Sequence, residues 1–132
     1  MEQIVYISTA RTDPDASMLD SILSASRRNN RRDGLTGLLV VGGRRFLQVL
    51  EGPRELCDKA YVRIRADQRH YALVQLSRRA ITERAFGDWD MGFEQTGGSS
   101  LSEMVDRLTA KVVDPSLQAQ FRSFADLHGK AA

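Results

Sequence analysis

The sequence predicts an α+β fold in which strands and helices alternate. Three observations lead to this prediction: short apolar runs with strand periodicity, two longer segments with helical periodicity, and a Gly42-Gly43 turn signal that joins two of the runs as a hairpin. The order is β-α-β-β-α-β with an added fifth strand, which is typical of the ferredoxin-like arrangement. In that arrangement two helices pack on one face of a mainly antiparallel sheet.

Residue types at the segment ends indicate where the two long helices begin and end. Asp13-Pro14 supplies an N-cap followed by proline at the first helical position, so the first helix is expected from there to about Asn30. Gly52-Pro53 opens the second helix, which is expected to last to about Asp67. The five strands are expected at residues 3–8, 35–41, 46–50, 71–76 and 89–93.

Two shorter helices are expected after the sheet. Ser100-Leu-Ser-Glu103 has the form of a capping box, and Asp114-Pro115 opens a second helical segment that stops at Gly129. Their apolar stripes comprise Leu101, Met104, Val105 and Leu108 in the first helix and Leu117, Phe121 and Phe124 in the second. Such amphipathic helices either cover the open face of the sheet or dock a partner protein.

Composition limits the classes of protein to which the chain can belong. Its 132 residues, 42% hydrophobic and 27% charged, suffice for one compact globular domain. A net charge of +2 does not indicate a nucleic-acid partner. The sequence shows no apolar run of membrane-spanning length and no secretory leader, so we expect a cytoplasmic protein without membrane association. One cysteine, Cys57, and two scattered histidines, His70 and His128, do not indicate a metal site.

Gln48 is a polar residue inside an apolar stretch, the expected third strand. Because side chains alternate across a strand, Phe46, Gln48 and Leu50 share one face and Leu47 and Val49 share the other. Both faces are expected to be buried. Each polar group of a buried carboxamide that lacks a partner costs about 1–3 kcal/mol. Gln48 must therefore find hydrogen-bond partners inside the fold.

A polar cluster is expected at one end of the slot between the two long helices. An apolar stripe becomes polar in each helix: Leu19, Ile22 and Leu23 are followed by Ser26, Asn29 and Asn30, and Leu56 and Ala60 by Arg63 and Asp67. Apolar walls with a few convergent polar groups are typical of a cofactor pocket. Alternatively, Arg63 and Asp67 form a surface ion pair while Asn30 caps its helix, and spacing alone favours this alternative. Tyr6 and Gln48, expected on neighbouring strands that face the helices, favour the pocket.

Together these residues resemble the BLUF domains, which sense blue light using FAD. The resemblance covers about Gln3 to Phe93 and depends on the order and spacing of several motifs. The motifs are Ile4-Val-Tyr6-Ile-Ser8-x-Ala10, Asn29-Asn30 with Gly34-Leu-Thr-Gly-Leu-Leu39, Phe46-Leu-Gln48-x-Leu-Glu-Gly-Pro53, Arg63-Ile-x-x-Asp67-x-Arg69-His70 and Trp89-Asp-Met91-Gly92. The expected division is a flavin-binding domain at residues 1–96 and a C-terminal helical extension at residues 97–132, which packs on the sheet or mediates contacts with other chains.

The resemblance implies that a flavin ring lies between the two long helices. The residues implied to bind it are Tyr6, Ile22, Ser26, Asn29, Asn30, Gln48, Arg63, Ile64 and Asp67. Asn30, Arg63 and Asp67 would hydrogen-bond the polar edge of the ring, and Ile22 and Ile64 would flank it. Trp89 and Met91 match a pair on the fifth strand that is associated with signalling in the family.

The implied function is that of a blue-light photoreceptor without enzymatic activity. Tyr6 would donate an electron and a proton to the photoexcited flavin, and Gln48, whose amide has a donor side and an acceptor side, would rearrange its hydrogen bonds. The resulting state would absorb at longer wavelength and pass a signal to a partner protein through the fifth strand and the C-terminal helices. Relatives without an output domain commonly form dimers or rings, so a homo-oligomer is also implied.

Two other functions are compatible with the same order of elements. An RNA-recognition domain needs exposed aromatic residues on the open sheet face, but the outward positions here are Val5, Ile7, Leu47 and Val49. An acylphosphatase-like hydrolase needs a phosphate-binding loop after the first strand, and residues 9–13 lack the glycine-rich cradle expected there. A flavin photoreceptor is therefore favoured over a nucleic-acid module or an enzyme.

Overall fold

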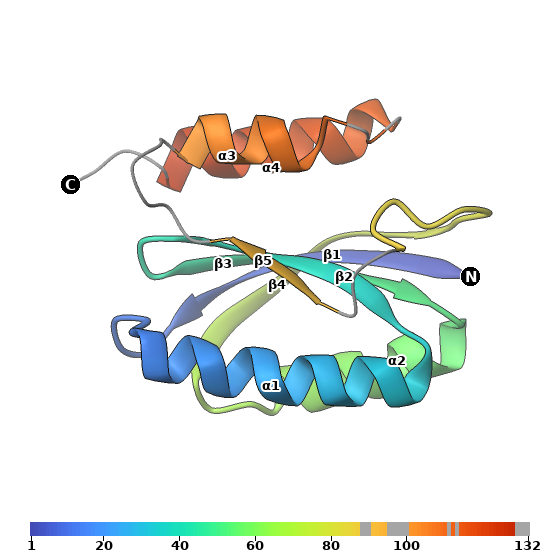
Figure 1. The fold of residues 1–132 in the computed structure, drawn as a ribbon, viewed down its shortest axis with the longest axis horizontal. Coiled ribbons are helices and arrows are strands. Elements are labelled where there is room, and N and C mark those ends of the chain that lie inside the picture. Colours follow the sequence, from blue (N-terminus) through green and yellow to red (C-terminus); the bar gives the residue numbers. More distant parts are fainter. Residues whose placement is uncertain (88–90, 95–100, 111, 113, 129–132) are drawn as a thin grey trace.

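The structure is a computed structural model that describes residues 1–87, 91–94, 101–110, 112 and 114–128. Its elements are β1 (Glu2–Ala10), α1 (Ala16–Asp33), β2 (Thr36–Gly42), β3 (Arg45–Gly52), α2 (Arg54–Arg65), β4 (His70–Ala80), β5 (Gly92–Glu94), α3 (Leu101–Leu108) and α4 (Pro115–His128). Figure 1 shows three layers, with the sheet in the middle, α1 and α2 on one face, and α3 and α4 on the other.

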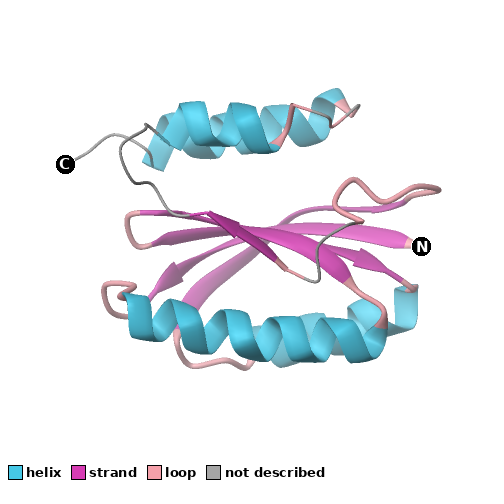
Figure 2. Ribbon diagram, viewed as in Figure 1, coloured by secondary structure: helices cyan, strands magenta, loops and turns pink. Residues whose placement is uncertain are grey.

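The five strands form one mixed sheet in the order β4-β1-β3-β2-β5. The first four strands in this order pair antiparallel, and β5 adds to the outer edge of β2 in parallel. Figure 2 shows this sheet between the two helical layers. The predicted ferredoxin-like fold with an added strand is confirmed. Because β1 pairs with β3, Tyr6 lies directly opposite Gln48.

The ends of α1 differ from the prediction. Asp15, rather than Asp13, is the N-cap: its carboxylate accepts a hydrogen bond from the Met18 N–H at 2.7 Å. The helix continues past Asn30 to Asp33 and ends at Gly34, whose left-handed backbone (φ 68°) directs its N–H to the Asn30 carbonyl oxygen. Asn30 therefore lies in the last turns of the helix rather than at its end.

The second helix is shorter than predicted, and the strands that follow it are shifted. α2 ends at Arg65 instead of about Asp67, because the Asp67 N–H bonds to the Ile64 carbonyl at 3.1 Å and closes a turn tighter than an α-helical one. β4 begins at His70 and continues to Ala80, well beyond its predicted end. The predicted start of the fifth strand, including Trp89, lies outside the described residues.

The sheet separates two apolar cores, as the alternation in β3 predicts. Phe46 and Leu50 belong to the core beneath α1 and α2, whereas Leu47 and Val49 belong to the core beneath α3 and α4. The C-terminal helices contribute Val105, Leu117, Phe121, Phe124 and Ala125 to this second core. The apolar outer face of the sheet is therefore covered by helices and is no platform for stacking bases.

Candidate functional site

A cavity lies between α1, α2 and the sheet. The residues that line it are Ser8, Ile22, Ser26, Leu39, Phe46, Gln48, Ile64, Asp67, Arg69 and His70. The space between its walls, counted together with the part open to solvent, is about 440 Å³. The lining has the expected form of apolar walls with a few polar groups.

The structure brings part of the predicted flavin-binding set together. The predicted residues that line the cavity are Ile22, Ser26, Gln48, Ile64 and Asp67. Tyr6 is not among the lining residues and lies opposite Gln48 in the sheet. Asn29 is half-buried and Asn30 is buried near the end of α1, whereas Arg63 is exposed on α2 and does not line the cavity. Of the polar cluster expected at the helix ends, Ser26 and Asp67 line the cavity, whereas Asn29, Asn30 and Arg63 are not among its lining residues.

Tyr6 has a buried hydroxyl group without a partner. The residue is 1% exposed, and its hydroxyl oxygen has no hydrogen-bond partner among the residues that the structure describes. Burial raises the pKa of the Tyr6 phenol well above its ordinary value, the nearby Tyr61 adds to this rise, and Arg63 opposes it. The phenol is therefore protonated at neutral pH. A buried, unpaired hydroxyl on the residue opposite Gln48, which lines the cavity, fits a site where a polar ligand completes the hydrogen bonding.

Gln48 contacts Met91 in the structure. Its Nε2 donates to the Met91 sulfur at 3.7 Å, and Met91 is 2% exposed within the core beneath α1 and α2. The Met91 carbonyl in turn accepts from Arg27 Nε at 3.0 Å, which ties the start of β5 to α1. A thioether is a weak acceptor, so the Gln48 N–H₂ group can exchange its bond to the Met91 sulfur for a stronger hydrogen bond. Of the predicted signalling pair, Met91 therefore lies on the cavity side of the sheet.

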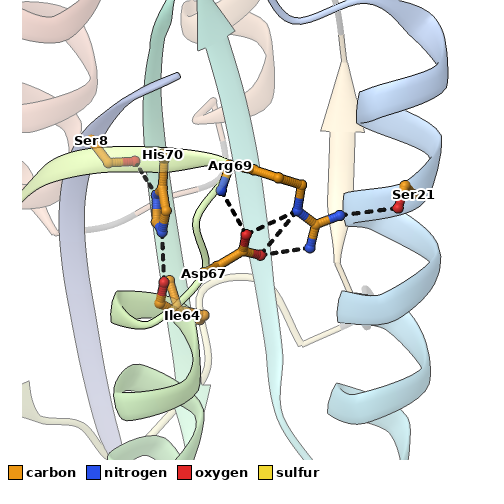
Figure 3. Close-up of polar contacts among 6 residues, drawn as sticks. All are labelled: Ser8, Ser21, Ile64, Asp67, Arg69 and His70. Atoms are coloured by element: carbon orange, nitrogen blue, oxygen red, sulfur yellow. Dashed lines mark hydrogen bonds and ion pairs between the residues drawn. The ribbon is translucent and has the colours of Figure 1, made fainter. Parts of the chain in front are cut away.

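Asp67 pairs with Arg69 rather than with Arg63 (Figure 3). The Asp67 carboxylate accepts from Arg69 Nε at 3.0 Å and Nη2 at 2.5 Å, and Arg69 Nη1 reaches Ser21 of α1 at 3.0 Å. The hydrogen bonds from Arg69 hold the pKa of the Asp67 carboxyl below its ordinary value, and Asp67 raises that of Arg69. The guanidinium group thus joins α1 to the turn after α2 at one end of the cavity.

Arg69 and His70 line the cavity although the residue-by-residue prediction did not assign them to it. His70 Nδ1 contacts Ser8 Oγ at 2.7 Å and Nε2 contacts the Ile64 carbonyl at 2.6 Å, so the ring joins β1 to the end of α2 (Figure 3). The sequence signal for both residues is their position two and three residues after Asp67, where the chain passes from the second helix to the sheet. Two polar side chains at such a point lie at the end of the slot.

Asp67→Asn is expected to lower the free energy of unfolding of the flavin-free protein by about 1 kcal/mol at pH 7, a value typical of partly exposed ion pairs. Because the pKa of Asp67 is lower in the folded state, its contribution is fully present above the unfolded value of about 3.9 and is lost as pH falls through the folded value. The free energies of unfolding of the two proteins, measured by urea unfolding from about pH 7 down to about pH 2, should become equal in acid. Asp20→Asn, at an exposed carboxylate of α1, is the control and should change little; an equal loss there would contradict the role of the pair.

Other kinds of site receive less support in the described part of the chain. No group of three histidine, cysteine, aspartate or glutamate side chains is placed there to hold a metal ion. Burial raises the pKa of the Cys57 thiol to about 11, so this cysteine is a protonated core residue and a poor nucleophile. Within the same residues, no helix has both the length and the apolar character needed to cross a membrane.

The fold and the slot define a small cofactor-binding domain of the ferredoxin-like class. The family model described as sensors of blue light using FAD matches residues 1–92, and the chain therefore belongs to the BLUF family. The predicted family is confirmed, and with it the flavin as the type of cofactor.

Curated relatives of the chain are light-regulated proteins. The chain is 34% identical over 84 residues to the blue light- and temperature-regulated antirepressor BluF of Escherichia coli (strain K12). This match covers 64% of this chain and 21% of that protein. The chain is 33% identical over 89 residues to the photoactivated adenylate cyclase subunit beta of Euglena longa. This match covers 67% of this chain and 10% of that protein. The chain therefore spans about a fifth and a tenth of the length of these two relatives.

Solved structures of BLUF proteins share the fold. The dark-state structure of the BLUF protein BlrB has a TM-score of 0.72 and 28% identity, and the match covers 96% of each chain. A bacterial light-regulated adenylyl cyclase has a TM-score of 0.72 and 31% identity over 96% of this chain and 35% of that one. Klebsiella pneumoniae BlrP1 with FMN has a TM-score of 0.82 at 23% identity over 95% of this chain and 34% of that one, which shows a shared fold.

Proposed function

We propose that this chain is a blue-light photoreceptor that holds FAD between α1 and α2. The observation that carries the proposal is the Tyr6 hydroxyl, which is buried and unpaired within the described part of the chain. It lies opposite Gln48, which lines the cavity. An unpaired buried hydroxyl costs about 1–3 kcal/mol of stability. The placement of Tyr6 opposite Gln48 is therefore better explained by a functional role than by a contribution to stability.

The residues proposed to hold the flavin ring fall into two groups. Ile22 and Ile64 line the cavity from opposite helices and would contact the two faces of the ring. Ser26, Asp67 and Arg69 line it as well and would supply hydrogen bonds to its polar edge. The remaining residues proposed for that edge are Asn29, Asn30 and Arg63.

Tyr6 and Gln48 are proposed to perform the photochemical step. When bound, the flavin supplies absorption of blue light and an excited state that accepts an electron and a proton. Tyr6 is the proposed donor, and its raised pKa keeps the O–H proton in place in the dark. The Gln48 carboxamide then exchanges its donor and acceptor sides, and Tyr6 recovers its electron and proton. The rearranged hydrogen bonds of the Gln48 amide would shift the absorption of the bound flavin to longer wavelength.

Met91 is the proposed first receiver of the signal. Its sulfur accepts a hydrogen bond from Gln48 Nε2, so any rearrangement of the amide changes this contact. β5 starts at the next residue and leads toward α3 and α4. We place Trp89 in the same relay and propose that a homo-oligomer in the cytoplasm passes the signal to a partner protein, with no catalytic step in this chain.

The absorption spectrum tests the proposed function. The protein, purified in dim light, is expected to be yellow, to shift slightly to the red under blue light, and to recover in darkness. Chromatography of the released flavin against FAD, FMN and riboflavin standards identifies the cofactor, and FAD is expected. A colourless protein that cannot be loaded with FAD would refute the function, and a flavin that shows no shift would refute the photochemistry.

A further inference from the structure

A buried carboxylate ties the loop after β4 to the end of β3. Glu51 is 0% exposed and lies on the side of β3 opposite Gln48. Its Oε2 accepts from the Ala85 N–H at 2.8 Å and from Gln3 Nε2 at 3.0 Å, and its Oε1 accepts from the Phe86 N–H at 2.8 Å. Hydrogen bonds to a charged acceptor are about twice as strong as neutral ones, so this carboxylate holds two successive backbone amides of the loop in place.

Arg84 provides a second tie for the same loop. Its Nη2 donates to the Gly34 carbonyl at 2.8 Å, and its Nη1 donates to Thr36 Oγ1 at 3.0 Å and to the Glu51 carbonyl at 3.3 Å. Gly34 is the residue that terminates α1. The planar guanidinium group therefore fastens the loop to α1, β2 and β3 at once, with a fixed geometry that an ammonium group does not provide.

Phe86 and Met91 lie in different cores, one on each side of the sheet. Phe86 is 3% exposed and belongs to the core beneath α3 and α4, where its ring lies 6.0 Å from the ring of Phe121 in α4. Farther along the chain, Met91 belongs to the core beneath α1 and α2 and contacts Gln48. A displacement can pass through the Phe86–Phe121 contact to α4 only if Phe86 is itself held firmly, because a loosely held ring would absorb the displacement.

We propose that Glu51 and Arg84 are positioning residues of the light signal. They hold Phe86 against Phe121, so that the change which Gln48 imposes on Met91 reaches α4. This inference rests on the proposed photoreceptor function. It assigns the signal route across the sheet to a hydrogen-bonded clamp at the end of β3, defined as Glu51 and Arg84.

Glu51→Gln tests the clamp in the flavin-loaded chain of 132 residues. The amide keeps the size of the side chain but offers an N–H₂ group where the carboxylate has an accepting oxygen. We expect the flavin spectrum and its red shift to be retained. The light-minus-dark difference in hydrogen exchange of peptides from residues 115–128 should fall by about threefold or more. Glu83→Gln is the matched control, because it removes the same charge from an exposed position in the same loop.

Arg84→Lys is the second variant, and it keeps the positive charge while losing the planar fork. The light-minus-dark difference in hydrogen exchange of α4 is expected to fall as in Glu51→Gln, and the red shift is expected to be retained. A purely structural role would increase exchange of α4 equally in light and dark and leave the difference unchanged, which would overturn the inference. A natural protein that shifts to the red but shows no light-dependent exchange in α4 would also overturn it. A natural protein without a red shift would instead refute the proposed function.

Discussion

Tyr6→Phe is expected to bind flavin with its ordinary yellow colour and to give no red-shifted state under blue light. The substitution removes one oxygen atom and leaves the buried ring in place, so the cavity keeps its shape. Without the phenol O–H, the proposed electron and proton donor opposite Gln48 is lost. The difference absorption spectrum between blue light and darkness measures the effect.

The same variant is expected to be more stable than the natural chain when flavin is absent. It removes a buried hydroxyl that is unpaired among the residues described, and such a group costs about 1–3 kcal/mol. Tyr61→Phe is the matched control, because its ring lies 5.6 Å from that of Tyr6 and it loses the same hydroxyl group. The control should keep the red shift. If Tyr6→Phe completes the full photocycle, Tyr6 is not the donor.

Gln48→Leu is expected to bind flavin without giving the normal red-shifted state. Leucine fills a similar volume but has neither the donor nor the acceptor of the carboxamide, so no hydrogen-bond exchange is possible. Loss of the donor to the Met91 sulfur also removes the proposed contact with β5. The same light-minus-dark difference spectrum should therefore be flat or displaced.

Gln75→Leu is the control for this substitution. Gln75 also pairs with Tyr6, but from β4 on the other side of β1, and its side chain is exposed. Its removal should leave the red shift unchanged. A normal shift in Gln48→Leu, or an equal loss in Gln75→Leu, would contradict the assignment of the hydrogen-bond change to Gln48.

The order of the elements could be predicted because it depends on local patterns. Apolar alternation, the Gly42-Gly43 turn and the Gly52-Pro53 break each depend on a few neighbouring residues, and the structure has a strand or helix at each predicted position that it describes. The ends of α1 could not be predicted as well, because Asp13 and Asp15 are both good N-caps. Only Asp15 has its carboxylate placed to accept the Met18 N–H.

The composition of the cavity could be predicted only in part. Ile22 and Ser26 follow from helical periodicity, which holds along a regular helix, whereas Ile64 is implied by the family resemblance. Arg63 and Asp67 share one face of the predicted helix, but α2 ends at Arg65 and the chain turns before Asp67. The i,i+4 relation therefore does not apply, and Asp67 pairs with Arg69 across the turn.

The sequence by itself determined which face of β3 carries Gln48, because alternation along a strand is a local property. Tertiary structure decided what the amide meets there. Met91 lies 43 residues away in the chain and contacts Gln48 at 3.7 Å. This placement depends on the parallel pairing of β5 with β2, the neighbour of β3. The Glu51 carboxylate likewise meets Ala85 and Phe86 only because the loop after β4 returns across the end of β3. Contacts at such separations depend on the packing of the whole sheet, which no local pattern encodes.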